Sequence, residues 1–342
     1  MPTDLTPPDP APVLDLLEAF RCSKIMFAAV RLEIFDRLEG RPQSAEVLAS
    51  DLPADLDALT RLLDACVGLR LLEKREQQYV NTPQASAYLC ETSPRRITGY
   101  INFSNEFLWP LWGHLEDAIR EGSHRWKQAF GWDQPIFSNF FRTEESKREF
   151  LIAMHGQGVI SSPQVVSAFD LSPFRQLVDL GGATGHLAIA ACRRYPHLEG
   201  IVFDLPEAAT LAEEFVADSP VASRIRVVPG DFFDDPLPEA DLFALGRILH
   251  DWSEDKVLLL LRRIHDRLPA GGGILIAEKL LLEDKSGPQW AHLQSLNMLV
   301  CTEGKERTLG EYEALLFRTG FTQVQGWRTN SPLDAVLAIK PH

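Results

Sequence analysis

The chain has 342 residues, of which 45% are hydrophobic and 24% charged, and its formal net charge is −14. This is the composition of a globular protein, and the length exceeds one average domain, so more than one packed unit is expected. The negative charge disfavours binding along a nucleic-acid backbone, and no apolar run approaches the ~18 residues of a membrane span.

The N-terminus lacks the basic and apolar regions of a signal peptide. Five cysteines are scattered singly along the chain, which favours buried, reduced thiols over disulfides or a zinc site. We therefore expect a cytoplasmic protein that holds no metal and binds neither nucleic acid nor a membrane.

The first hundred residues predict a small helical unit. Residues 1–12 are rich in proline and are expected to be a disordered tail. Apolar spacing and turn residues then predict helices over 13–38, 44–49 and 56–68, followed by two short strands at 71–74 and 78–81. This order is typical of a winged helix, which we expect to span 13–100. Because the helix over 58–70 has only Arg61 and Arg70 as cations, dimerisation is favoured over DNA binding.

Aromatic residues are dense in the next region, 101–170, which ends in a predicted linking helix over 149–169. We expect most of them to be core, and some to line an apolar pocket suited to a flat ring. They are Phe103, Phe107, Trp109, Trp112, Trp126, Phe130, Trp132, Phe137, Phe140 and Phe141.

Strands and helices alternate from 171 to 342. The predicted strands lie at 176–180, 201–204, 225–228, 240–245 and 274–277, with helices at 254–268, 289–301 and 309–319 and two terminal strands near Val324 and Leu337. Such alternation predicts an α/β domain with a doubly wound, Rossmann-like parallel sheet and a hairpin-like edge. A ligand is then expected outside the carboxyl ends of the strands.

The first of these strands runs into a glycine-rich turn, 181–185. Glycine permits positive φ and a close approach of the backbone to a ligand. The turn lacks the G-x-G-x-x-G spacing of a dinucleotide site, whereas Asp179, two residues before Gly181, is more typical of an S-adenosylmethionine (SAM) site. Asp204 follows the turn by about 20 residues, where an acid accepts hydrogen bonds from ribose hydroxyls. The glycines alone are equally compatible with a tight strand-to-helix turn.

A histidine follows the strand at 240–245. Because an unperturbed imidazole has a pKa of ~6.5 and a phenol one of ~10, His250 can take the proton of a phenolic hydroxyl as that oxygen attacks. Glu278 ends the next strand, and Glu306 lies in a charged turn further on. Carboxylates near an imidazole fix its tautomer and stabilise its cation, although a lone histidine or a charged turn can also have a purely local role.

On the helix over 289–301, Asn297 and Cys301 share a face. Asn297 can orient a substrate hydroxyl or amide by a hydrogen bond. A helix-to-helix contact fits this residue equally well.

Six segments in this order resemble the SAM-dependent class I O-methyltransferases of the plant caffeate and animal acetylserotonin type. They are Asp-Leu-Gly-Gly-Ala-Thr-Gly, Val-Phe-Asp-Leu-Pro-Glu, Gly-Asp-Phe-Phe, Arg-Ile-Leu-His-Asp-Trp, Ser-Leu-Asn-Met-Leu-Val and Thr-Glu-Gly-Lys-Glu-Arg-Thr. The resemblance runs from about Leu14 through nearly the whole chain. It implies a homodimer that transfers a methyl group from SAM to the hydroxyl of a small aromatic acceptor, phenolic or hydroxyindole-like.

The resemblance also implies roles for single residues. His250 is the expected general base, flanked by Glu278 and Glu306. Position at the sheet edge and the resemblance together give these expected cofactor contacts: Gly181, Asp204, Gly230, Asp231, Phe232 and Arg247. The expected substrate contacts are Asp251, Asn297 and Cys301.

Three positions depart from the acetylserotonin type. Cys301 stands where that type has a substrate-contacting glutamine, Gly158 where it has a tryptophan close to the cofactor, and Phe141 where it has a tyrosine. The pocket is expected to differ in shape while the base is retained, so N-acetylserotonin does not follow as the acceptor. Two alternatives remain: a SAM enzyme acting on nitrogen or in another reaction, and a winged-helix regulator that senses a small molecule.

Overall fold

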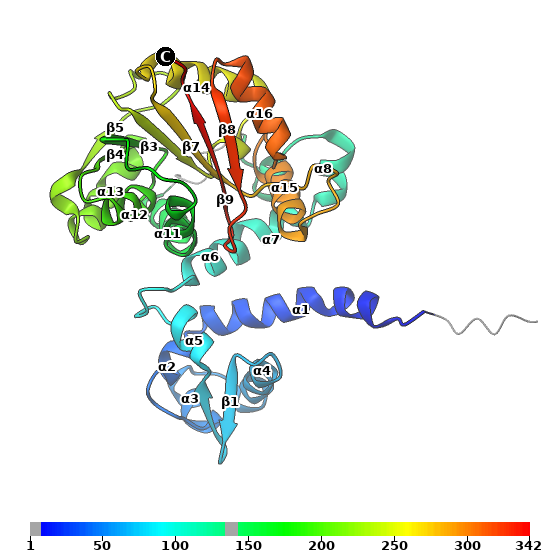
Figure 1. Ribbon diagram of the computed structural model, residues 1–342. Coiled ribbons are helices and arrows are strands. Elements are labelled where there is room, and N and C mark those ends of the chain that lie inside the picture. The colour runs from blue at the N-terminus through cyan, green and yellow to red at the C-terminus, as the bar shows by residue number, and fades with distance from the viewer. Residues whose placement is uncertain (1–7, 134–142) are drawn as a thin grey trace, which may run out of the picture. The chain divides into compact units, whose positions relative to one another are not determined.

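The computed structural model describes residues 8–133 and 143–342 (Figure 1). The chain divides into two compact units, Met1–Asn105 and Glu106–His342. Most of the predicted tail, together with the predicted aromatic residues Phe137, Phe140 and Phe141, lies outside the described residues. Within them, no helix combines the length and apolar character needed to cross a membrane.

The N-terminal unit consists of helices around one antiparallel hairpin. Its elements are α1 (Ala11–Arg31), α2 (Ile34–Leu38), α3 (Ala45–Asp51), α4 (Leu56–Gly68), β1 (Leu72–Arg75), β2 (Gln78–Asn81), α5 (Pro83–Tyr88) and α6 (Thr98–Phe103). The single helix predicted over 13–38 is wrong in two respects. It begins at Ala11, inside the predicted tail, and it breaks after Arg31, because Glu33 adopts a left-handed φ of 56° that a helix cannot continue through.

The helices predicted over 44–49 and 56–68 and the two short strands are confirmed, with ends within two residues of those predicted. Asp55 caps α4 by accepting a hydrogen bond from the backbone N–H of Ala58 at 2.8 Å, and the two predicted strands pair as β1 and β2. Arg61, one of the two cations of the predicted helix, forms an exposed ion pair with Asp57 on α4, whereas Arg70 lies beyond the end of α4. The core of the unit is apolar and is built from side chains such as Ile34, Phe35, Leu48, Leu63 and Leu72.

Four short helices and one long helix precede the α/β part of the second unit in the described residues. They are η1 (Ser104–Leu108), which spans the boundary between the units, α7 (Trp109–Trp112), α8 (Leu115–Glu121), α9 (Trp126–Phe130) and the long α11 (Glu144–Ser167). The helix predicted over 149–169 therefore begins five residues earlier and ends two residues earlier. Its start is set by a capping box, in which Thr143 and Ser146 each satisfy the other's backbone N–H.

A seven-stranded sheet forms the centre of the second unit, with the strand order β5-β4-β3-β6-β7-β9-β8. Its elements are β3 (Gln176–Leu180), α12 (His186–Arg194), β4 (Glu199–Asp204), α13 (Pro206–Ala217), η2 (Ala222–Arg224), β5 (Ile225–Pro229), β6 (Leu242–Gly246), η3 (Leu249–Asp251), α14 (Glu254–Arg267), β7 (Gly273–Glu278), α15 (Gln289–Cys301), α16 (Leu309–Arg318), β8 (Thr322–Trp327) and β9 (Asp334–Ile339). Strands β3 to β7 are parallel, and the antiparallel β8–β9 pair confirms the predicted hairpin-like edge.

The sheet has an apolar core on each face, because side chains alternate along its strands. In β6, Phe243 and Leu245 belong to the core that includes α14 and α16, whereas Leu242 and Ala244 belong to the core that includes α11, α12 and α13. Figure 1 shows the sheet with helices packed along it. The predicted doubly wound architecture is confirmed.

The strand order also locates the point where a ligand is expected. From β3 the chain proceeds outward through β4 to β5, and it then returns to add β6 and β7 on the other side of β3. Open α/β sheets bind ligands at such a switch point, outside the carboxyl ends of the strands. The segments at this point are the glycine turn after β3, Asp204 at the end of β4, Gly230 after β5 and Arg247 after β6.

All five cysteines lie in the described part of the chain, and each is a free thiol. Cys66, Cys90, Cys192 and Cys301 are buried as predicted. Cys22 is exposed, contrary to the prediction, because it lies on the outer part of α1.

Candidate active site

Two carboxylates, those of Asp179 and Asp204, hold the glycine turn after β3 and the start of α12. Asp179 is buried, and its Oδ2 accepts the backbone N–H of Ala188 in α12 at 3.1 Å. Asp204 accepts the backbone N–H of Ala183 at 2.7 Å with one oxygen and that of Leu205 at 2.7 Å with the other. Gly181 and Gly185 have φ values of 64° and 75°, which L side chains rarely adopt. The turn is thus shaped by its acids as much as by its glycines.

Burial affects both of these acids in the same direction. It raises the pKa of Asp179 to about 7 and that of Asp204 to about 6, although backbone N–H donors oppose the shift in each case. Each oxygen of Asp204 has one backbone donor and a further lone pair. Asp204 can therefore hold the turn and still accept hydrogen bonds from ribose hydroxyls.

The segments after β5 and β6 close on the turn from opposite sides. A Cβ added to Gly181 would overlap the side chain of Ile248 and would lie 3.4 Å from the ring of Phe232. After β5, the backbone N–H of Gly230 donates to the carbonyl of Asp204 at 2.8 Å, and Asp231 accepts the N–H of Phe233 at 2.7 Å. The structure therefore brings the predicted cofactor residues Gly181, Asp204, Gly230, Asp231 and Phe232 together at one edge of the sheet.

Arg247 also lies at this edge, in a left-handed conformation with φ of 58°. Its backbone N–H donates to the carbonyl of Ala277 at 3.1 Å, and its guanidinium donates to the side-chain oxygen of Gln157 at 3.4 Å. Gln157 lies on α11. No sequence pattern predicted that a polar side chain of this helix reaches the cofactor residues. A non-glycine residue in this backbone region costs energy and persists only where the surrounding structure holds the backbone in place.

His250 lies in η3, where its imidazole is enclosed by carboxyl groups. Its Nδ1 is 2.6 Å from Oε1 of Glu306 and 3.1 Å from Oε2 of Glu278, and its Nε2 is 3.8 Å from Oδ1 of Asp251. The histidine and the two glutamates are almost completely buried. When Glu306 is ionised, Nδ1 carries the proton and donates it to that carboxylate, which leaves Nε2 as the basic nitrogen. This is the arrangement of a base held by an orienting acid.

Backbone contacts fix the two glutamates. Oε1 of Glu278 accepts the backbone N–H groups of Ile248, Leu249 and His250 at 3.0, 2.9 and 3.4 Å, which ties η3 to the end of β7. The charged turn that contains Glu306 packs against η3, because a Cβ at Gly304 would overlap the carbonyl of His250. Buried Arg307 donates to the carbonyl of Leu249 at 3.0 Å.

Burial raises the pKa of each carboxyl group around His250. The pKa values are about 7 for Glu278, about 8 for Glu306 and about 7 for Asp251. His250, Glu278 and Glu306 also place potential ligand atoms within 4.8 Å of one another, so that the set has the dimensions of a cation site. The 2.6 Å separation between Nδ1 and Oε1 of Glu306 is that of a direct hydrogen bond, which is the geometry of a proton-transfer group.

The predicted substrate residues lie on and beside α15. Oδ1 of Asn297 accepts the indole N–H of Trp112 at 2.9 Å and the thiol of Cys301 at 3.6 Å. Burial raises the pKa of the Cys301 thiol, which keeps its proton for this bond. In the sequence, Trp112 is one of the dense aromatic residues and has no further predicted role. No sequence signal paired it with Asn297, which is 185 positions further along the chain.

An aromatic cluster packs against the end of α15. The rings of Phe107, Trp126, Phe130 and Trp132 contact one another, with centroid separations from 4.6 to 6.3 Å. The indole N–H of Trp126 donates to the carbonyl of Cys301 at 2.7 Å. This places part of the predicted aromatic region beside the predicted substrate residues.

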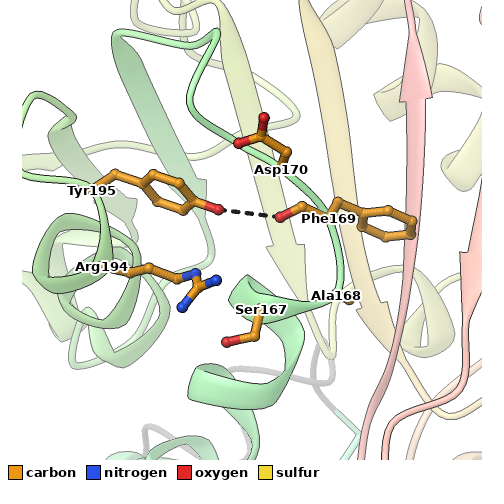
Figure 2. Close-up of a pocket in the computed structure, with 6 residues that line it drawn as sticks. All are labelled: Ser167, Ala168, Phe169, Asp170, Arg194 and Tyr195. Carbon is orange, nitrogen blue, oxygen red and sulfur yellow. Dashed lines mark hydrogen bonds between the residues drawn. The ribbon is translucent and has the colours of Figure 1, made fainter.

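A separate hollow lies at the opposite end of α12, away from the glycine turn (Figure 2). It has a volume of about 570 Å³ and is lined by Ser167, Ala168, Phe169, Asp170, Arg194 and Tyr195. In Figure 2 the hydroxyl of Tyr195 points to the carbonyl of Phe169, to which it donates a hydrogen bond of 3.2 Å. None of the predicted site residues lines this hollow, so it is not part of the site at the strand ends.

Comparison with known proteins identifies the family. The model of an O-methyltransferase domain matches residues 112–322, and that of an O-methyltransferase dimerisation domain matches residues 14–91. The chain belongs to the O-methyltransferase family.

Individual relatives agree with this assignment. Acetylserotonin O-methyltransferase from Gallus gallus is 42% identical over 97% of both chains. The solved structure of human N-acetylserotonin methyltransferase in complex with SAM is 38% identical, covers 99% of this chain and 100% of its own, and superposes with a TM-score of 0.93. A probable bifunctional dTTP/UTP pyrophosphatase/methyltransferase protein from Homo sapiens is 44% identical over 98% of this chain, which spans 54% of that protein's length.

Proposed function

We propose that the protein transfers the methyl group of SAM to the hydroxyl of a small aromatic acceptor, with His250 as the general base. The observation that carries this proposal is the buried His250 held at Nδ1 by Glu306 and Glu278, at the same sheet edge as the glycine turn and Asp204. SAM supplies an activated methyl group, so the protein's main tasks are to align the acceptor oxygen and to remove its proton.

The residues at the sheet edge fit SAM. Asp204 supplies acceptors for ribose hydroxyls, and the turn brings its backbone close to Phe232 and Ile248, which leaves an apolar wall at the same place. Asp231, Gly230 and Phe232 follow β5, beside Asp204, and we assign them to the adenosine end. Arg247 follows β6, on the other side of β3, and we assign it to the charged amino-acid end.

His250 removes the acceptor's proton through Nε2. As the imidazole becomes cationic, Glu306 and Glu278 stabilise the charge at Nδ1. Asp251 is 3.8 Å from Nε2, and burial raises its pKa to about 7, so it is partly protonated near neutral pH and can contact the acceptor hydroxyl without repelling it.

The polarity of Asn297 narrows the acceptor chemistry. An indole N–H can only donate, and the protonated thiol of Cys301 donates as well, so the amide must present its oxygen to both groups. The amide NH₂ is then left to face the acceptor, which must offer an oxygen or another hydrogen-bond acceptor. Aromatic residues beside α15 favour a flat ring. A phenol and a hydroxyindole both meet these requirements, and N-acetylserotonin is one candidate.

A screen of hydroxylated aromatic compounds with methyl-labelled SAM tests the reaction, with N-acetylserotonin and a set of aromatic amines included. Labelled ether products that are lost in His250→Ala, while binding of S-adenosylhomocysteine (SAH) is retained, are the expected result. Labelling of amines alone would replace this proposal by N-methylation. If His250→Ala methylated phenols at the wild-type rate, the assignment of His250 as the general base would be refuted.

The role of Asn297 has its own test. Asn297→Asp can still accept from Trp112 but cannot donate to the acceptor, so KM for the acceptor should rise about tenfold or more, with SAH affinity unchanged. Gln289→Glu makes the same change of amide to acid at the exposed start of α15 and serves as the control. Equal KM values in the two variants would contradict the assignment.

We further propose that the N-terminal unit is a winged helix that forms a homodimer through α1. Five large apolar residues on this helix are at least half exposed, namely Val13, Leu14, Leu16, Leu17 and Phe20. An exposed apolar patch of this kind marks an interaction site, and the match to a dimerisation domain supports a second copy of the chain as the partner.

Light scattering on the eluting protein tests the dimer. Leu16→Lys together with Leu17→Lys should shift the molar mass to that of a monomer, whereas Leu259→Lys, on an exposed position of α14, should not. A wild-type monomer at micromolar concentration would refute the proposal. Finally, five free thiols fit a reducing compartment, and the cytoplasm is our proposed location.

A further inference from the structure

A second histidine, His186, lies at the cofactor edge and is not part of the mechanism above. It is the first residue of α12, directly after Gly185 of the glycine turn. Its ring occupies the space above Gly158 of α11, because a Cβ at that position would overlap the Cγ, Cδ2 and Nδ1 atoms of the imidazole. The side chain therefore lies in a notch that α11 leaves by having glycine at this position, and Cε1 and Nε2 are not among the three ring atoms nearest to Gly158.

A hydrogen bond joins the Nδ1 atom of this ring to α11. Nδ1 of His186 is 2.9 Å from the hydroxyl of Ser162, a residue that is almost fully buried. When Nδ1 is unprotonated, the serine donates to it and the proton of the neutral ring is on Nε2. The contact proposed below for His186 requires this tautomer.

The surroundings keep this ring neutral. Burial lowers the pKa of His186 to about 3, and the nearby His155 and Arg247 act in the same direction. Neighbouring contacts fix the position of the turn as well, since His155 on α11 is 2.8 Å from the hydroxyl of Thr184. His186 is therefore a fixed, uncharged N–H donor that the positive charge of Arg247 reaches.

SAM has one group that remains to accept a hydrogen bond from the Nε2–H of His186. The ammonium and sulfonium groups are cations and cannot accept a hydrogen bond. The ribose hydroxyls are assigned to Asp204, and the adenine to the loop after β5, on the far side of β4 from Arg247. The carboxylate of the amino-acid end accepts hydrogen bonds and is attracted by a guanidinium.

We propose that His186 binds the carboxylate of SAM through its Nε2–H, together with Arg247, and that Gly158 and Ser162 position the ring for this contact. The contact makes His186 a cofactor-binding residue and makes Gly158 a determinant of cofactor affinity. The inference rests on SAM as the cofactor and is independent of the identity of the acceptor.

Calorimetry with two ligands tests the proposal. SAH carries the amino-acid end, whereas 5′-methylthioadenosine has the same nucleoside without it. His186→Phe retains a flat ring but has no N–H donor, so its affinity for SAH should fall about tenfold while that for 5′-methylthioadenosine stays within twofold. His197→Phe, the same substitution at an exposed position after α12, should leave both affinities unchanged.

The notch is tested by Gly158→Ala, whose methyl group should displace the ring and reproduce the selective loss of SAH affinity. In the His186→Ala background, Gly158→Ala should cause no further loss. Equal losses for both ligands, or no loss of SAH affinity in either single variant, would overturn the carboxylate contact. A wild-type protein that bound neither ligand would instead refute SAM as the cofactor, so the two failures are distinguishable.

Discussion

Replacing Glu306 by glutamine separates the charge of this side chain from its shape. The attraction between a carboxylate and an imidazolium at 2.6 Å is about 6 kcal/mol at an effective dielectric constant of ~20. This is an upper bound, because Glu278 provides a second carboxyl group at 3.1 Å and because burial raises the pKa of Glu306 to about 8, which leaves it mostly neutral at pH 7. We expect a loss of about 2–3 kcal/mol, or about 30- to 150-fold in kcat.

Initial rates with methyl-labelled SAM and an acceptor found in the screen measure this loss. The rate deficit of Glu306→Gln should grow between pH 7 and pH 9, because the wild-type carboxyl group ionises over this range and the amide does not. Glu303→Gln is the control, since Glu303 lies in the same loop and forms a more exposed ion pair with Lys256. A kcat within twofold of wild type, in a variant with unchanged SAH affinity and thermal stability, would refute the orienting role of Glu306.

Three further predictions concern the cofactor edge, the packing of η3 and stability. Asp204→Asn should weaken SAH binding at least tenfold in calorimetry, because the amide has only one acceptor oxygen for two backbone donors and the ribose. Gly304→Ala should lower the free energy of unfolding by about 1–3 kcal/mol and reduce kcat, because the new methyl group overlaps the carbonyl of His250, whereas Gly68→Ala, with open space around it, should do neither. The free energy of unfolding, measured with urea, should fall as the pH rises from 6.5 to 8.5, because carboxyls with raised native pKa values bind protons that the unfolded chain has already released. Below pH 6.5, His186 has the opposite effect on the free energy of unfolding, because its pKa is lowered to about 3. Above pH 6.5, the free energy of unfolding should fall less steeply in Glu306→Gln than in the wild type. A free energy of unfolding that rose between pH 6.5 and pH 8.5 would contradict the burial of these acids. The acids concerned are Asp179, Asp204, Asp251, Glu278 and Glu306.

Much of the second unit follows from local sequence patterns. Alternating apolar strands and helices predict a parallel sheet, and the carboxyl ends of parallel strands meet at one edge. The sequence therefore brings Gly181, Asp204, Arg247 and His250 together without knowledge of packing. Glu278 ends the neighbouring strand β7 and belongs to the same edge for the same reason.

Other features depend on packing between distant segments. Glu306 has the local pattern of a solvated charged turn, but it is buried, because the N–H of Leu281 donates to the carbonyl of Arg307 and Gly304 packs on η3. The contacts of α11 with Arg247, Thr184 and His186 join residues that no periodicity relates. The break at Glu33 depends on one left-handed residue, for which an ordinary glutamate gives no signal.

The proposed base and the proposed acceptor contacts lie on different elements, η3 and α15. His250 is attached to the end of a central strand through backbone N–H groups that meet Glu278, and these contacts do not depend on side chains near the acceptor. Asn297 and Cys301 lie one turn apart on α15, and neither side chain takes part in those backbone contacts. On the roles proposed above, new acceptors can arise by substitution on a single turn of α15, while the backbone contacts that hold His250 are retained.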